Sequence, residues 1–315
     1  MAINRKSAAS RALVREARLS ADSLVMPLFV RSGVRAPTPI RSMPGQFQWP
    51  IDELASECET LFRGGVPAVL LFGVTEKKIK TASASAAYAA GGLVPRAVRA
   101  IKKAVPDLLV ITDVCLCAYT ADGHCRLPST EATLKTLGKM AVAHAAAGAD
   151  FVGPSDMTDG NVGAVRRSLD GARLEGTGIL AYTVKYASAL YGPFREAADS
   201  APAFGDRRSY QMDPANAVEA LREAEQDIAQ GADILMVKPA LGYLDIVHAL
   251  KQRFTLPIAA YNVSGEYAMV KAAAQQGWLD ERGVWMEQLL CMRRAGADIL
   301  ITYWAKEAAR TLRGR

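Results

Sequence analysis

Short apolar runs alternate with helix-like stretches eight times along this chain of 315 residues. Such runs are typical of strands in a parallel sheet, because both faces of those strands are covered. Three runs follow the repeated sequences Ala-Gly-Ala-Asp150, Gln-Gly-Ala-Asp233 and Ala-Gly-Ala-Asp298, whose glycines suit the end of a helix. Eight strand–helix repeats predict a single α/β domain, a (β/α)8 TIM barrel. The expected strands span roughly residues 23–30, 68–72, 108–114, 149–153, 178–185, 232–237, 257–263 and 298–303.

Bulk properties narrow the class of protein further. We expect an N-terminal arm over residues 1–20 and a catalytic barrel over residues 21–315, since no linker interrupts the alternation. The formal net charge is +6, but the basic residues are scattered, which argues against nucleic-acid binding. No apolar stretch approaches the roughly 18 residues of a membrane span. The absence of a secretory signal and the odd count of five cysteines predict reduced thiols in the cytoplasm.

Two successive expected strands end in lysine, Lys185 and Lys238. Reactive residues of such barrels lie at the carboxyl ends of the strands. Desolvation there lowers the pKa of a lysine and frees a nucleophilic amine, which can form an imine with a carbonyl substrate. If the two strands are neighbours, each ammonium also lowers the pKa of the other. One strand-end lysine alone is usually a surface residue, so the prediction rests on the pair.

Three cysteines, Cys115, Cys117 and Cys125, lie within 11 residues of sequence. Thiolates favour zinc, and three of them leave a fourth position for water or substrate, as a catalytic zinc requires. His124 could be a fourth ligand, a donor behind the ligands or an ordinary loop histidine, and we expect no direct ligation by it. The alternatives are three unrelated reduced cysteines or a redox pair, for which the Cys-x-Cys spacing is poorly suited.

A stretch of about 25 residues follows Lys185 and is rich in glycine, proline, arginine and tyrosine. A stretch of this length between elements is often an active-site lid. Its residues Arg195 and Arg207 could form paired hydrogen bonds with a carboxylate. The other strand ends are polar as well, and Asp113 and Asp156 are candidate proton carriers there. These features together place the expected chemistry at one rim of the barrel.

In combination these motifs resemble the porphobilinogen synthase (5-aminolaevulinate dehydratase) family over nearly the whole chain. The motifs that carry the resemblance are Asp113-Val-Cys-Leu-Cys117, Gly123-His-Cys125, Pro154-Ser-Asp-Met157, Lys185-Tyr-Ala-Ser, Tyr191-Gly-Pro-Phe-Arg195, Met236-Val-Lys-Pro239 and Val263-Ser-Gly-Glu-Tyr-Ala-Met269. The resemblance implies a cytoplasmic hydro-lyase of haem and other tetrapyrrole biosynthesis. Such an enzyme condenses two molecules of 5-aminolaevulinate into porphobilinogen through lysine Schiff bases.

The resemblance also implies roles for individual residues. Lys238 matches the family's main Schiff-base lysine, Lys185 the second lysine, and the three cysteines the ligands of a catalytic Zn2+. Glu223 matches a ligand of an allosteric Mg2+ that part of the family has. Family members are commonly homo-octamers whose N-terminal arms hold neighbouring subunits. The expected substrate-binding residues are Arg195, Arg207, Gln211, Tyr261, Ser264, Tyr303, Ser155 and Asp113.

The chain departs from the usual sequence motifs of the family at several positions. Ala118, Asp122 and Arg126 replace the usual Glu, His and Gly around the cysteines, and Asn262 replaces a Gln. These changes bear on loop packing and zinc affinity. The alternatives are therefore a specialised paralogue with a substrate like 5-aminolaevulinate, or another class I Schiff-base aldolase. An aldolase would need one lysine and no metal, and a degenerate carrier would have lost a lysine or a cysteine.

Overall fold

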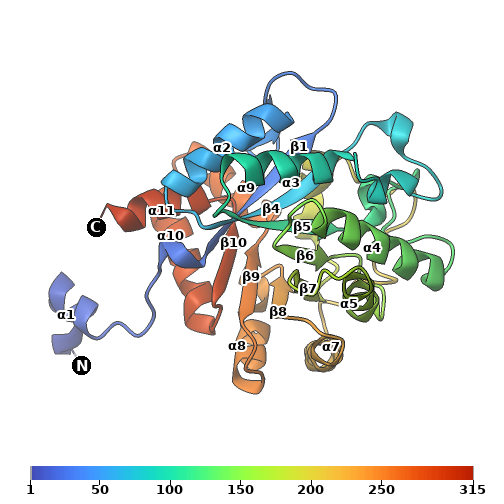
Figure 1. Ribbon diagram of the computed structural model, residues 1–315. Helices are drawn as coiled ribbons and strands as arrows, with labels where there is room; N and C mark the ends of the chain where they lie inside the picture. The colour runs from blue at the N-terminus through green and yellow to red at the C-terminus, as the bar shows by residue number, and fades with distance from the viewer. Residues whose placement is uncertain (1, 315) are drawn as a thin grey trace.

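A closed barrel of parallel strands forms the centre of the computed structural model, which describes residues 2–314 (Figure 1). Neighbouring strands follow one another in chain order, and the last pairs with the first through Leu24 and Leu300. The predicted TIM barrel is confirmed, and each expected run overlaps one barrel strand. These strands are β1 (Leu24–Arg31), β4 (Ala68–Val74), β5 (Leu109–Val114), β6 (Phe151–Pro154), β7 (Gly178–Lys185), β8 (Ile234–Lys238), β9 (Ile258–Asn262) and β10 (Ile299–Thr302).

Helices cover the outside of the barrel (Figure 1). In α3 the buried residues Val94, Ala97, Val98 and Ile101 recur at three- and four-residue spacing, so one stripe of the helix packs inward. The outer helices are α2 (Ile51–Arg63), α3 (Leu93–Ala104), α4 (Thr130–Ala145), α5 (Asn161–Gly171), α7 (Val218–Ala229), α8 (Leu244–Arg253), α9 (Ser264–Gln275), α10 (Glu281–Ala295) and α11 (Ala305–Arg313). Two further short strands, β2 (Thr38–Pro39) and β3 (Phe47–Trp49), extend the sheet beside β1. The hydrophobic core therefore lies inside the barrel and between barrel and helices.

The repeated Gly-Ala-Asp sequence builds the amino-terminal rim of the barrel. Its glycines Gly148, Gly231 and Gly296 have φ of 104°, 98° and 121°, a region that glycine enters without strain. The following aspartates accept hydrogen bonds from backbone amides at the start of the preceding strands. Asp150 accepts from Val110 at 2.7 Å, Asp233 from Ile179 at 2.7 Å, and Asp298 from Ile258 at 2.9 Å. Each repeat thus ends a helix and ties two neighbouring strands together.

The N-terminal segment extends away from the barrel (Figure 1). It contains a short 3-10 turn (Ala2–Arg5) and α1 (Ala8–Leu13), whose first turn Ser7 caps. Leu13 is 82% exposed there. Among residues 2–314, we found no helix with both the length and the apolar character that crossing a membrane requires.

Candidate active site

Lys185 and Lys238 lie side by side at the carboxyl ends of β7 and β8. The two strands pair in parallel, and the lysines are register partners. Only 6% of Lys185 and 4% of Lys238 is exposed. The expectation that the two lysines end neighbouring strands and are desolvated is therefore met by the geometry.

Aromatic rings surround the amine of Lys238. Its Nζ lies 4.3 Å from the ring centre of Tyr261, 5.0 Å from that of Phe194 and 5.1 Å from that of Tyr182. Burial, together with the charge of Lys185, lowers the pKa of Lys238 to about 7. A substantial fraction of this lysine is thus the neutral, nucleophilic amine near neutral pH.

Lys185 has a more polar setting than Lys238. Its Nζ donates a hydrogen bond to the main-chain oxygen of Ser155, which follows β6. Asp113, near the end of β5, faces the same pocket. Burial and the nearby Cys117 raise the pKa of Asp113 to about 6. Its Oδ1 is buried and has no hydrogen-bond partner within the described part of the chain. This oxygen is therefore available to a bound ligand.

The three predicted thiols converge next to this pocket. Cys115, Cys117 and Cys125 are buried, and their sulfurs all lie within 4.8 Å of one another. Cys115 Sγ is 3.3 Å from Cys117 Sγ. A short turn after β5 (Leu116–Ala118) bends the chain at Cys117. Gly123, with φ of 71°, helps the chain to turn back, so that Cys125 lies beside the other two cysteines. His124 instead points its ring nitrogens to Tyr210 and to the Phe204 carbonyl, at 3.3 Å and 3.1 Å.

The donor set fits a zinc ion. Hydrogen bonds from Cys115 and Cys125 hold the pKa of Cys117 well below its usual range, so one thiolate forms readily. A metal would displace the remaining thiol protons, because only deprotonated sulfur ligates. A small cavity of about 20 Å³, lined in part by Asp113, Cys115 and Cys117, adjoins the cluster. It offers room of about one water for a fourth ligand.

The segment after β7 closes over Lys238. It was expected to be a long loop, but it contains a short 3-10 turn (Ala189–Tyr191) and a helix, α6 (Gly192–Ala197). Tyr191 donates its hydroxyl hydrogen to the Lys238 carbonyl at 3.2 Å. The Phe194 amide donates to Ser264 Oγ at 3.0 Å, at the start of α9. In this structure the segment is therefore docked on the strand ends that carry the two lysines.

The other predicted substrate residues lie around this lid. Arg207 is buried and donates through Nη2 to the carbonyls of Gly123 and Ser200, at 3.0 Å and 2.6 Å. Its Nε, and Nε2 of the buried Gln211, lack partners among residues 2–314 and can bind a ligand. Arg195 is half-buried on α6.

Two further predicted residues have hydroxyls that are already engaged. Ser264 Oγ also lies 3.4 Å from the Leu190 carbonyl, so both of its contacts are with the lid. The Tyr303 hydroxyl lies 3.2 Å from that of Tyr261. These hydroxyls would have to exchange their present partners to bind a carboxylate.

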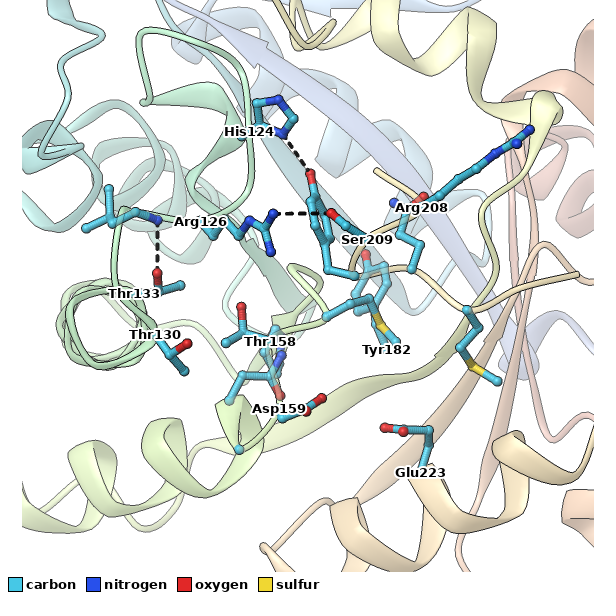
Figure 2. Close-up of a pocket in the computed structure, with 18 of the residues that line it drawn as sticks. His124, Arg126, Thr130, Thr133, Thr158, Asp159, Tyr182, Arg208, Ser209 and Glu223 are labelled. Carbon is cyan, nitrogen blue, oxygen red and sulfur yellow. Dashed lines mark hydrogen bonds between the residues drawn. The ribbon is translucent and has the colours of Figure 1, made fainter. Parts of the chain in front are cut away.

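A separate cavity of about 900 Å³ lies outside the lysine pocket and reaches it at Tyr182. Figure 2 shows His124 and Arg126 on one side of it and Asp159 and Glu223 on the other. Glu223 is half-buried on α7, and its pKa is raised by burial and by the neighbouring Asp159 and Glu219. Neither lysine lines this cavity.

Several residues of the site were missed in the sequence. Phe72 lies near the end of β4 and Phe194 lies on α6, and both rings face the Lys238 amine. Phe72 could have been recognised as a site residue from the sequence, because it ends the expected strand over residues 68–72 at the same rim as the lysines. Tyr182 was not recognisable, because it stands three residues before Lys185 and a regular strand would point the two side chains to opposite faces.

Comparisons with known proteins show the family to which the chain belongs. Residues 1–311 match the model of the delta-aminolevulinic acid dehydratase family. The chain belongs to this family. It is 49% identical over 313 residues to the delta-aminolevulinic acid dehydratase of Halalkalibacterium halodurans, covering 98% of this chain and 95% of that relative. It is 50% identical over 311 residues to the Synechocystis protein of the same name, and the match covers 96% of this chain and 94% of that relative.

A solved structure shows the same similarity in three dimensions. It is the delta-aminolevulinic acid dehydratase (porphobilinogen synthase) of Toxoplasma gondii, in complex with the reaction product porphobilinogen. The TM-score is 0.95 at 46% identity, and the match covers 98% of this chain and 90% of the other. The family resemblance read from the motifs is thereby confirmed.

Proposed function

We propose that this dehydratase is a porphobilinogen synthase, a hydro-lyase that condenses two 5-aminolaevulinate molecules through an imine on Lys238. The observation that carries this proposal is the pair of buried, register-matched lysines beside three converging thiols. Family membership supports the reaction, and the geometry supports the roles of the residues. A single-lysine aldolase would have no use for the thiol cluster.

In the proposed mechanism, the neutral amine of Lys238 attacks the ketone of one substrate. Loss of water then leaves an imine, which withdraws electrons and makes the adjacent carbon acidic enough for carbon–carbon bond formation. Lys185 keeps the pKa of Lys238 low and holds the second substrate near it. Holding both substrates in place contributes several kcal/mol, on the order of 7 kcal/mol in favourable cases.

The open donors of the pocket would bind the polar groups of the substrates. Arg207 Nε and Gln211 Nε2 point to carboxylate binding, with Arg195, Ser264 and Tyr303 as further anchors. Asp113 and Ser155 would bind an amine or carry a proton, and Tyr261 would pack on the imine. Zinc held by Cys115, Cys117 and Cys125 would act as a Lewis acid for the second substrate.

The proposal extends to assembly and regulation. The exposed apolar residues Ile3, Leu13 and Val14 of the arm suit packing against neighbouring subunits in a homo-octamer. Glu223 would bind an activating Mg2+, because its half-buried carboxylate faces Asp159. The five free cysteines suit the cytoplasm. Light scattering would test the octamer, and Mg2+ titration of Glu223→Gln against the unmodified enzyme would test the magnesium site.

The decisive assay is pyrrole formation from 5-aminolaevulinate, before and after chelation and after return of zinc. We expect activity that chelation abolishes and zinc restores. No pyrrole under any of these conditions would refute the reaction, and activity indifferent to chelators would refute the catalytic zinc.

A further inference from the structure

The register of β7 against β8 shifts by one residue before the two lysines. Three steps on β7, from Ala181 to Val184, oppose two steps on β8, from Leu235 to Val237. An extra residue of this kind reverses the alternation of side chains, and such bulges often re-aim a side chain next to an active site. Here it turns Tyr182 towards the same pocket as Lys185. The Tyr182 ring centre lies 5.6 Å from Lys185 Nζ and 5.1 Å from Lys238 Nζ.

The Tyr182 hydroxyl is buried without a partner. Three tyrosine rings lie over the Lys238 amine within 6 Å, those of Tyr182, Tyr191 and Tyr261. The hydroxyl of Tyr191 donates to the Lys238 carbonyl, and that of Tyr261 lies 3.2 Å from the Tyr303 hydroxyl. The Tyr182 hydroxyl makes no hydrogen bond of normal length in the described chain, and its neighbouring acceptor is the carboxyl of Asp113, whose Oδ1 is unpaired as well. Because a buried hydroxyl without a partner is destabilising, its position calls for a bound partner.

The strand beside it makes room for Tyr182. A Cβ on Gly153 of β6 would lie 3.0 Å from Tyr182 Cε2, closer than ordinary contact. The backbone of Gly153 does not have the positive φ that glycine alone tolerates. The same Cβ would lie 3.3 Å from the Leu180 carbonyl oxygen. The absence of a side chain therefore makes room for the ring of Tyr182 and for the backbone of β7, and does not serve a turn. The bulge, the space beside Gly153 and the buried hydroxyl together hold a donor next to Asp113, on a ring that faces both amines.

We infer that Tyr182 is a catalytic hydrogen-bond donor, whose hydroxyl binds the oxygen of the ketone that Lys238 attacks. This inference rests on the proposed function. Negative charge builds on that oxygen as the amine adds, so a donor already in place stabilises the transition state more than the bound ketone. Burial raises the pKa of Tyr182 well above its usual value. The phenol therefore keeps its proton throughout and acts only by donating the hydrogen bond.

The test is Tyr182→Phe in the zinc-loaded enzyme, with steady-state kinetics and single-turnover borohydride trapping. We expect kcat to fall about 10- to 100-fold, KM to stay within about threefold, and the imine on Lys238 to form more slowly by the same factor as kcat. The melting temperature should change little, because the hydroxyl makes no hydrogen bond of normal length in the described chain. Gly153→Ala, which displaces the ring, should lower kcat by a smaller factor in the same way.

Tyr186→Phe is the matched control. Tyr186 directly follows the same strand, but its hydroxyl donates outward to the Asn216 carbonyl at 2.8 Å. We expect its kcat to be unchanged. A kcat for Tyr182→Phe within twofold of the unmodified enzyme, or imine formation at the normal rate, would overturn the inference. Failure of the unmodified enzyme to form pyrrole would instead overturn the proposed function, so the two failures are distinguishable.

Discussion

The two rims of this barrel treat their charged groups in opposite ways. At the amino-terminal rim, Asp150 accepts hydrogen bonds from Val110 N and from Lys102, and Asp298 accepts from Ile258 N and Lys251. At the carboxyl-terminal rim, Lys238 is enclosed by rings with a second ammonium as its neighbour. Satisfied charges stabilise a fold, whereas desolvated ones cost stability and gain reactivity. The comparison predicts that mutations at the two rims change opposite properties.

The largest effect should come from Lys238→Met. We expect product formation to fall at least about a thousandfold, because the nucleophile is lost. Since each pKa unit is worth about 1.4 kcal/mol, holding Lys238 neutral costs on the order of 4 kcal/mol. The variant should therefore unfold at higher denaturant concentration, with a gain of about 2–4 kcal/mol.

Lys251→Met provides the control for that variant. Lys251 belongs to the amino-terminal rim and pairs with Asp298 at 2.7 Å, with its side chain 35% exposed. We expect full activity and a loss of at most about 1 kcal/mol, as for other partly exposed pairs. Equal changes in activity for Lys238→Met and Lys251→Met would contradict the proposed difference between the two rims.

Cys117→Ser should have the next largest effect. Removing one of three converging sulfurs should abolish stoichiometric zinc binding and lower activity at least about 100-fold. Metal content by mass spectrometry measures the first effect directly. Cys291→Ser, outside the cluster, should keep both zinc and activity. Retention of zinc by the Cys117 variant would contradict the assigned ligand set.

The pH dependence sharpens the contrast between the rims. Below pH 7 Lys238 is protonated, so kcat/KM should rise about tenfold per pH unit and level off above about 7. Between pH 7 and 10.5 the unfolded chain carries a proton on Lys238 that the folded chain lacks, so stability should rise with pH. Denaturation series should show this rise flattened in Lys238→Met. A flat activity profile from pH 5.5 to 8 would argue against a lowered pKa.

The smallest effects should come from the rim aspartates. Asp150→Ala removes a short bond to Val110 N and a lysine partner, and should lower the free energy of unfolding by about 2 kcal/mol. The more exposed Asp233 bonds Ile179 N, and Asp233→Ala should cost about 1 kcal/mol. Turnover per folded molecule should stay constant in both. A loss of turnover without loss of stability would mean that this rim also takes part in the chemistry.

Local sequence patterns were enough to predict the barrel and to bring the two lysines and the three cysteines together. Apolar runs that follow a helix-ending glycine mark strands and helices directly, and lysines at strand ends share a rim once the barrel closes. The β7 bulge could not be predicted from the sequence, because it depends on the pairing of β7 with β8 and no residue near Tyr182 marks it. The docking of Phe194 on Ser264 was missed for a similar reason, since 70 residues separate them.

Borohydride trapping in the presence of 5-aminolaevulinate, followed by peptide mass mapping, tests the central claim most directly. The account predicts a reduced adduct on Lys238 at pH 7 and above, and none on Lys102 or Lys251 at the opposite rim. An enzyme that forms pyrrole but yields no adduct on Lys238, or is trapped equally at the amino-terminal rim, would contradict it.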